Sequence, residues 1–236
     1  MRILVCSDVH GNPYAIRSAI EKERHDMSIF LGDIVDYGPF PAECIDLVKD
    51  SFDLVVQGNH DYAASTGRDC MCSQENHDLS VYTRENITMR QVGSSGLEYL
   101  RSLPKSLRKD IDGQMVEINH GSPENRLYGY LYPTNITGEN LQDESGSRIN
   151  ADILMVGHTH YQFSLPVNGM LIMNPGSIGQ PRDGFDMPSY AVIDTVDWTV
   201  SLKRISYDRE RLRRDIVNSM PEGPMRDKNL RLFRFP

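Results

Sequence analysis

Short apolar runs recur along the chain, and nearly every one ends abruptly in polar residues. They occupy residues 3–6, 28–31, 54–56, 115–118, 153–156 and 170–173. Apolar runs of this length, bounded by glycine and polar residues, are typical of strands that are buried on both faces. Segments with the helical spacing of apolar positions follow the first two runs, at 14–24 and 42–49. Strands that alternate with helices in this way predict an α/β fold.

The segment 63–109 interrupts this alternation. It is polar and mostly helical, with one helix predicted near 77–91 and a shorter one at 96–102. Two interpretations remain open from the sequence. The segment is either a helical layer that covers a sheet face or a cap that shapes the substrate pocket.

The last part of the chain returns to strands and then to a helix. Residues 190–194 and 199–205 predict a β-hairpin, and 208–220 predicts a charged amphipathic helix. This helix opens a C-terminal helix and tail over 208–236. Because no stretch rich in glycine and serine separates these parts, we expect a single domain over 1–236.

The chain carries a net charge of −8 over 236 residues, with 39% hydrophobic and 25% charged residues. These proportions argue against disorder. The acidic balance disfavours nucleic acid and membrane partners, although bound cations would let the protein hold a small phosphorylated substrate. No segment reaches the roughly 20 apolar residues that span a bilayer, and no N-terminal leader is predicted. Since the four cysteines do not suggest a disulfide framework, we expect a cytoplasmic location.

Residues that bind metals stand at the ends of five of the apolar runs. Five of the seven histidines of the chain belong to this set, which comprises Asp8, His10, Asp33, Asn59, His60, His120, His158 and His160. Each residue alone has an ordinary alternative, as a turn residue or a structural histidine. Because ligands bind at the carboxyl ends of strands in α/β folds, the whole set predicts one two-metal site. In an extended segment, His158 and His160 would point to the same face.

The motifs occur in an order that resembles the calcineurin-like metallophosphoesterases, in their small prokaryotic branch. The resemblance covers residues 2–160, with a further signature at 174–177, and rests on Asp8-Val9-His10, Gly32-Asp33-Ile34-Val35-Asp36, Gly58-Asn59-His60-Asp61, His120-Gly121 and Gly157-His158-Thr159-His160. It implies an αββα sandwich of two mixed β-sheets flanked by helices, with 63–109 as a helical cap insertion. Tyr37 stands where related protein phosphatases carry an arginine, which argues against a phosphoprotein phosphatase.

The resemblance also implies a role for each residue. One metal ion would be held by Asp8, His10 and His160, the other by Asn59, His120 and His158, and Asp33 would bridge them. These oxygen and nitrogen donors suit two divalent metal ions, with manganese (Mn²⁺) as our first expectation and iron, zinc, cobalt or nickel as alternatives. His60 would protonate the leaving group or hold the phosphoryl group, and Asp36 would hydrogen-bond His60. We expect Asp61 to support these residues from behind.

The implied activity is hydrolysis of a small phosphomonoester, phosphodiester or nucleotide by a metal-bridging hydroxide. Two alternatives are a noncatalytic metal-binding scaffold of the same fold, which would bind other proteins, and a nuclease. The presence of both Asn59 and His60 favours catalysis over the scaffold. The acidic net charge disfavours the nuclease.

Three further features have less specific patterns. Asn12 is a candidate for substrate binding, although it is equally suited to cap the helix that begins at Pro13. Arg182 is a second candidate, for a phosphate or another anionic group, unless it pairs with Asp183 or Asp186. Cys70-Met71-Cys72 with His77 is a weak candidate for zinc, because no second close pair of ligands accompanies it.

Overall fold

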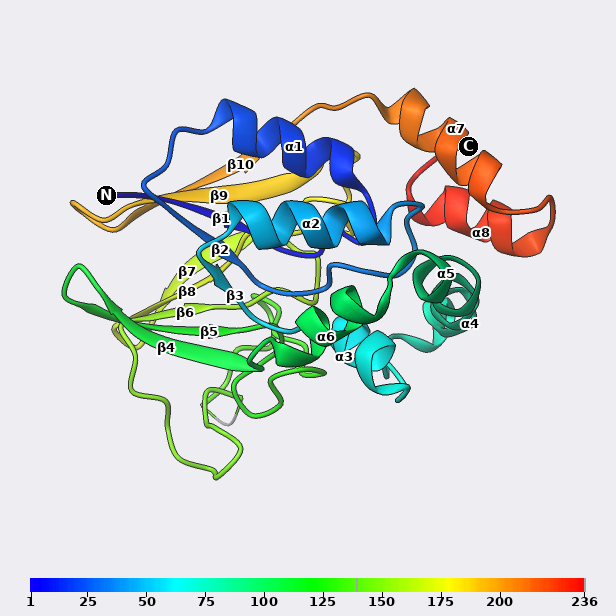
Figure 1. Ribbon diagram of the computed structural model, residues 1–236. Helices are drawn as coiled ribbons and strands as arrows, with labels where there is room; N and C mark the ends of the chain where they lie inside the picture. The colour runs from blue at the N-terminus through cyan, green and yellow to red at the C-terminus, as the bar shows by residue number, and fades with distance from the viewer. Residues whose placement is uncertain (139, 236) are drawn as a thin grey trace.

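Two five-stranded sheets pack face to face in the computed structural model, which describes residues 1–138 and 140–235 (Figure 1). The first sheet has the order β10-β9-β1-β2-β3. Its β1, β2 and β3 are parallel, and its β9 runs antiparallel to β1. The bounds are β1 (Arg2–Cys6), β2 (Met27–Phe30), β3 (Leu54–Val55), β9 (Ser189–Asp194) and β10 (Thr199–Arg204). The predicted hairpin is confirmed as β9 and β10.

The second sheet has the order β4-β5-β6-β8-β7 and is also mixed. Its central β5, β6 and β8 are parallel, and each edge strand is antiparallel to its neighbour. The bounds are β4 (Ser106–Ile111), β5 (Gln114–Asn119), β6 (Ile153–Met155), β7 (Phe163–Val167) and β8 (Met170–Asn174). The two edge strands were not predicted. They are partly exposed, so they carry no continuous apolar run, and β7 contains Pro166, which an edge position tolerates.

Strand β1 shows how the core is divided. Ile3 and Val5 point between the two sheets, whereas Leu4 and Cys6 point to the outer face of the first sheet. That outer face is covered by α1 (Pro13–Lys22) and α2 (Pro41–Ser51), as Figure 1 shows. Because side chains are buried on both faces, the strand reads as a continuous apolar run rather than an alternating one.

A long loop between β5 and β6 packs against the outer face of the second sheet. Its Leu131 and Leu141 are buried with Leu154 and Ile172 of the strands. The loop therefore covers the outer face of the second sheet, as α1 and α2 cover the outer face of the first. The helices gather over the first sheet and at the end of the molecule where α3 to α6 lie (Figure 1).

The inserted helices are α3 (Asn59–Thr66), α4 (Gln74–Thr83), the π-helix η1 (Arg84–Thr88), α5 (Met89–Gln91) and α6 (Ser94–Ser102). The expected helices near 77–91 and 96–102 are thus confirmed. The insertion, expected at about 63–109, has somewhat different bounds in the structure. The helical part begins at Asn59 and ends at Ser102, and residues 106–109 already belong to β4, which pairs with β5.

The C-terminal part contains the predicted helix and one more. Helix α7 (Arg209–Ser219) begins as expected, with the Asp208 carboxylate accepting a hydrogen bond from the backbone amide of Arg211. The unpredicted α8 (Pro224–Leu232) follows. Leu79 of α4 packs with Leu212 of α7 and Leu230 of α8, so both helices close against the inserted helices.

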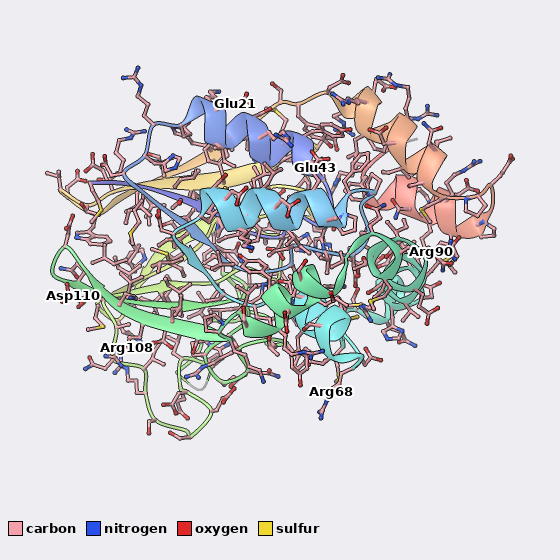
Figure 2. The ribbon with its side chains drawn as sticks, viewed as in Figure 1. Glu21, Glu43, Arg68, Arg90, Arg108 and Asp110 are labelled. Atoms are coloured by element: carbon pink, nitrogen blue, oxygen red, sulfur yellow. The ribbon has the colours of Figure 1, made fainter. Side chains whose placement is uncertain are left out.

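Charged side chains project from the outer helices, such as Glu21 on α1, Glu43 on α2 and Arg90 on α5 (Figure 2). Among the residues that the structure describes, no helix combines the length and the apolar character needed to cross a bilayer.

A buried carboxylate joins α1 to the first sheet and makes a testable contribution to stability. Glu23 accepts hydrogen bonds from Tyr190 (2.7 Å) and Lys203 (2.8 Å). Burial alone would raise the pKa of Glu23, but the hydrogen bonds from Lys203 and Tyr190 outweigh it and hold the pKa below its ordinary value. Such a group stabilises the fold at neutral pH and loses this contribution as the pH falls through its folded-state pKa.

We therefore expect Glu23→Gln to lower the free energy of unfolding by about 1–3 kcal/mol at pH 7. Urea denaturation measured down to about pH 3 should show the difference from wild type shrinking as the pH falls. Glu21→Gln, on the exposed face of the same helix, is the control and should change little. A difference that is the same at every pH would contradict the role given to the Glu23 charge.

Candidate metal centre

The loops that leave the strands at one end of the two sheets adopt an unusual backbone conformation. Twelve of the described residues other than glycine have positive φ. Seven of them belong to this region: Asp8, His10, Asp33, Asp36, Tyr37, His158 and His160. Non-glycine residues with positive φ carry a cost that clusters at functional sites. The same conformation corrects one expectation. His158 (φ 64°) and His160 (φ 56°) do not lie in an extended segment, and their ligand atoms belong to different groups of candidate metal ligands.

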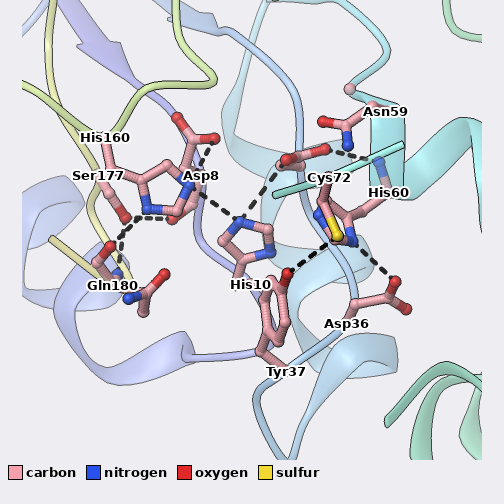
Figure 3. Close-up of polar contacts among 12 residues, drawn as sticks. Asp8, His10, Asp36, Tyr37, Asn59, His60, Cys72, His160, Ser177 and Gln180 are labelled. Carbon is pink, nitrogen blue, oxygen red and sulfur yellow. Dashed lines mark hydrogen bonds and ion pairs between the residues drawn. The ribbon is translucent and has the colours of Figure 1, made fainter. Parts of the chain in front are cut away.

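The first group of metal-ligating atoms comes from the loops after β1, β2 and β6. Ligand atoms of Asp8, His10, Asp33 and His160 all lie within 4.8 Å of one another. The Nε2 atoms of His10 and His160 are 3.2 Å apart, and Asp8 Oδ1 is 3.2 Å from His160 Nε2 (Figure 3). All four side chains are buried.

The second group shares Asp33 with the first. Ligand atoms of Asp33, His120 and His158 lie within 4.8 Å of one another. The Asn59 side chain joins them, because its Oδ1 is 3.0 Å from His120 Nε2 while its Nδ2 donates to the backbone carbonyl of Cys70. The structure therefore brings together all seven residues predicted to hold metal, in two groups with Asp33 common to both.

Backbone carbonyls orient the imidazoles of this centre. Nδ1 lies 2.9 Å from the Val35 carbonyl in His10, 2.6 Å from the Leu31 carbonyl in His120 and 2.5 Å from the Gln180 carbonyl in His160. A carbonyl only accepts hydrogen bonds, so each Nδ1 carries the proton and donates it. In the neutral ring Nε2 is then an unprotonated acceptor that points into the centre, as a metal-binding histidine requires.

These residues fit a pair of divalent cations. Both carboxylate oxygens of Asp8 and the Nε2 of His158 are buried without a hydrogen-bond partner among the described residues. Buried acceptors that lack donors are costly, and a cation would satisfy them. Burial also holds the pKa of His10 and of His158 well below the ordinary value, so both rings are neutral and able to ligate.

The charge of Asp33 needs a positive partner in this buried place. Burial would lower the pKa of His120, but Asp33, with Asp8, raises it to about 9. A proton on His120 or a bound metal ion can therefore supply the positive charge. Metal ions and protons should compete for this ring.

His60 lies beside the two groups and is held by Asp36. Its Nδ1 is 2.9 Å from Asp36 Oδ2, and its ring centroid is 5.1 Å from that of His10 (Figure 3). The expected hydrogen bond between His60 and Asp36 is thus confirmed. Burial would lower the pKa of His60, but the charge of Asp33 and the hydrogen bond to Asp36 raise it above the ordinary value.

The inserted helices supply the partners of Asp36. Arg84 donates to Asp36 Oδ2 from Nη2 (2.7 Å) and Nε (3.0 Å), Thr88 donates to Oδ1 (3.0 Å), and Ser80 lies 3.3 Å from Oδ2. Arg84 and Thr88 open and close the π-helix η1, whose wider turn brings both side chains to one carboxylate. No local motif in the sequence marks these residues as partners of Asp36, because they lie 44 to 52 positions from it.

The Asp61 carboxylate supports the centre from behind, as expected. It accepts hydrogen bonds from the backbone amides of Asp33 (2.9 Å), Ile34 (2.8 Å) and Gly58 (3.0 Å). The bridging position also depends on Gly58, since a Cβ there would lie 2.1 Å from Asp33 Oδ1. Asn59 and His60 stand at the start of α3 rather than in a loop after a strand.

The two candidates for substrate binding differ in their surroundings. Asn12 is fully buried, caps α1 by accepting from the backbone amide of Tyr14, and donates to the carbonyl of Gly179. It is therefore better explained as a helix cap than as a substrate contact. Among the described residues, Arg182 does not form the alternative ion pairs. Asp183 pairs with Arg204, and the Asp186 carboxylate lies 3.7 Å from Arg209 Nη1 and 3.8 Å from Arg234 Nη1.

The cysteine motif lies near the centre in an arrangement different from the one expected. Cys70 and Cys72 are free thiols whose sulfur atoms are 3.1 Å apart, and both lie near His60. His77 forms an ion pair with Asp69 (2.9 Å) and is not grouped with both cysteines. The structure thus gives no Cys70–Cys72–His77 cluster among the described residues.

Aromatic rings line one side of the second group. The Tyr130 ring centroid is 4.2 Å from that of His158, and Tyr132 lies parallel to Tyr130 at 6.2 Å. Both tyrosines are partly exposed. They come from the long loop on the second sheet, where the sequence shows no regular pattern that would mark them as part of the site.

Two mixed sheets that carry buried carboxylate, amide and imidazole groups at one end define a metal-binding α/β protein. Residues 1–197 match the calcineurin-like phosphoesterase superfamily domain, and the chain belongs to this superfamily. An uncharacterized protein of Methanocaldococcus jannaschii is 33% identical over 93% of this chain and 94% of its own. The crystal structure of a metallophosphoesterase from Sphaerobacter thermophilus is similar at 30% identity, covering 97% and 98% of the two chains with a TM-score of 0.78. A hypothetical protein from Pyrococcus horikoshii shares the fold, with 22% identity over 94% of each chain and a TM-score of 0.76.

The shared position of Asp33 gives a test of the centre. We expect Asp33→Asn to reduce binding at both metal positions, because the amide removes the charge that the two groups have in common. Metal content after loading with Mn²⁺ and desalting should fall from about two ions per chain to fewer than one. Asp46→Asn, on the exposed face of α2, is the matched control and should keep both ions. Loss of a single ion from Asp33→Asn would show that the carboxylate serves one position only.

Proposed function

We propose that this protein hydrolyses small phosphoric esters with two divalent metal ions bound, Mn²⁺ being the first candidate. The observation that carries the proposal is the pair of buried ligand groups that share Asp33, with the His60–Asp36 pair beside them. Bound cations would activate a water molecule and neutralise charge on the phosphoryl oxygens. The membership of the chain in the phosphoesterase superfamily supports the same reaction class.

In this proposal the side chains divide the work. Asp8, His10 and His160 would hold one cation, Asn59, His120 and His158 would hold the other, and Asp33 would contribute to both positions. His60 donates a proton to the departing oxygen, or a hydrogen bond to the phosphoryl group. Asp36 keeps the Nδ1 proton of His60 in place and stabilises the positively charged ring.

The alternatives of a noncatalytic scaffold and a nuclease receive less support. A noncatalytic scaffold does not require the buried His60, whose pKa is raised. Nor does it require Arg84 and Thr88 to hold the Asp36 carboxylate against this histidine. The net charge of −8 disfavours a polyanion such as nucleic acid as the general partner. The cytoplasmic location stays a prediction.

Two artificial substrates test the activity. We expect the protein to release p-nitrophenolate from p-nitrophenyl phosphate or from bis(p-nitrophenyl) phosphate when Mn²⁺ is added, and to lose this activity with a chelator. The ratio of the two rates also gives the preference for monoesters or diesters. No turnover of either ester with manganese, iron, zinc, cobalt or nickel would refute the proposal.

Substitution of His60 separates catalysis from metal binding. We expect His60→Ala to lower kcat by about 100-fold or more while two metal ions stay bound, since His60 moves a proton and holds no cation. Steady-state kinetics and metal analysis on the same sample provide the two measurements. His25→Ala is the control, because this ring lies between α1 and β2, at the opposite end of β2 from Asp33, with its Nδ1 2.7 Å from the Glu23 carbonyl, and its kcat should stay near that of wild type. If the metal content of His60→Ala collapses, His60 is a ligand and the division of roles is wrong.

A further inference from the structure

A cavity of about 560 Å³ opens between the loop that follows β8, the start of α4 and the C-terminal helix α8. Its lining contains four cationic side chains, Arg182, Lys228, Arg231 and Arg234, and one carboxylate, that of Glu75. The chain as a whole has 25 basic and 33 acidic residues, so this excess of positive charge is opposite to the average of the protein. A positively charged cavity of this size suits a small anionic ligand.

Among the described residues, one buried nitrogen of the Arg182 guanidinium has no hydrogen-bond acceptor. Its Nη2 is buried and has no hydrogen-bond partner, while its Nε donates to Gln180 Oε1 (3.0 Å). Over residues 1–138 and 140–235, neither Arg182 nor Arg231 forms an ion pair. Lys228 has Asp78 at 2.5 Å, and Arg234 has the exposed Asp186 at 3.8 Å. A buried guanidinium donor without an acceptor is costly, and an anionic ligand would remove that cost.

The cavity adjoins the metal centre through a short chain of contacts. The backbone amide of Arg182 donates to the carbonyl of His160 (3.4 Å), and the Arg182 guanidinium lies 5.9 Å from the Tyr37 ring centroid. The Tyr37 ring is in turn 4.9 Å from the ring of His10. A substrate whose ester phosphate sits between the ligand groups would therefore have this cavity within reach.

Helix α8 is fixed against the same loops. Asn229, fully buried, donates from Nδ2 to the backbone carbonyl of Tyr37 (2.8 Å), and Gln180 donates from Nε2 to the carbonyl of Leu232 (2.9 Å). Figure 1 shows α8 at the end of the molecule where α4 and α5 lie. These contacts fix α8, and with it Lys228 and Arg231, next to Tyr37.

We propose that this cavity binds a second phosphate group of the substrate, so that the protein prefers small phosphoric esters that carry a further phosphate. The inference rests on the proposed phosphoesterase function and adds the substrate class. A guanidinium group can donate two parallel hydrogen bonds to two oxygens of one phosphate. A phosphate, with a charge near −2, also balances several cations better than a carboxylate does. Lys228, Arg231 and Arg234 lie beyond residues 1–197, so this specificity comes from a part of the chain outside the superfamily domain.

The test compares two substrates that differ by one phosphate. With the Mn²⁺-loaded protein, kcat/KM for adenosine 3′,5′-bisphosphate should exceed that for adenosine 5′-monophosphate by about tenfold or more, because charge-assisted hydrogen bonds are added. In Arg231→Ala the loss on the bisphosphate should be at least several times the loss on the monophosphate. Arg214→Ala removes an exposed charge from α7 outside the cavity and is the matched control. Equal kcat/KM for the two nucleotides, or equal losses in Arg231→Ala, would overturn the proposal.

A binding experiment separates this proposal from the proposed function. Calorimetric titration with inorganic pyrophosphate, without added metal, should show binding to wild type and to Arg214→Ala, and binding weaker by about tenfold in Arg231→Ala. This result can hold even if p-nitrophenyl phosphate is not hydrolysed, in which case only the catalytic proposal fails. If both artificial esters are hydrolysed but pyrophosphate does not bind, the cavity is not a phosphate site. Tighter binding of a single-stranded oligonucleotide than of pyrophosphate, lost in Arg231→Ala, would overturn the assignment to small molecules in favour of a polyanion.

Discussion

The Oδ2 atom of Asp33 lies between the imidazoles of His10 (3.6 Å) and His120 (3.3 Å), and both ligand groups depend on this buried carboxylate. Its position is set from three sides. Asp61 accepts from the backbone amide of Asp33, His60 donates its own backbone amide to Asp33 Oδ1 (2.9 Å), and Gly58 leaves room for the carboxylate. These contacts join the end of β2 to the start of α3. Burial and the charge of Asp33 raise the pKa of Asp61 to about 7, which reflects how closely negative charge is gathered here.

The buried hydrogen-bond acceptors gathered at this end of the sheets are suited to binding cations. The loops hold strained positive-φ residues, and the imidazoles of His10 and His120 turn their Nε2 atoms toward Asp33 Oδ2. Without a positive charge such an arrangement would be unfavourable, whereas bound metal ions would stabilise it. The charge of Asp33 also raises the pKa of His60, so the candidate metal ligands and the histidine proposed to donate a proton are electrostatically coupled.

The inserted helices and the C-terminal helix complete the site from two directions. Arg84 and Thr88 of η1 hold Asp36, and through it His60, so the insertion has a role in positioning as well as in covering the sheet. Helix α8 contacts the carbonyl of Tyr37, one residue beyond Asp36. The superfamily domain thus contains the groups proposed for the chemistry. Helix α8 and the residue Arg234 after it, all beyond residue 197, supply three of the four cationic side chains of the cavity proposed for substrate choice.

The sequence by itself determined the central strands, the helices that follow them and the set of residues that meet at the metal centre. It did so because strands buried on both faces are continuous apolar runs, and because ligand residues stand directly at their ends. Only the tertiary structure decided the edge strands β4 and β7, whose partial exposure breaks the apolar pattern. It also decided the partners of Asp36, the capping role of Asn12 and the unpaired state of Arg182 among the described residues. These depend on contacts between segments far apart in the chain, and a contact of that kind leaves no periodic or local signal in the sequence.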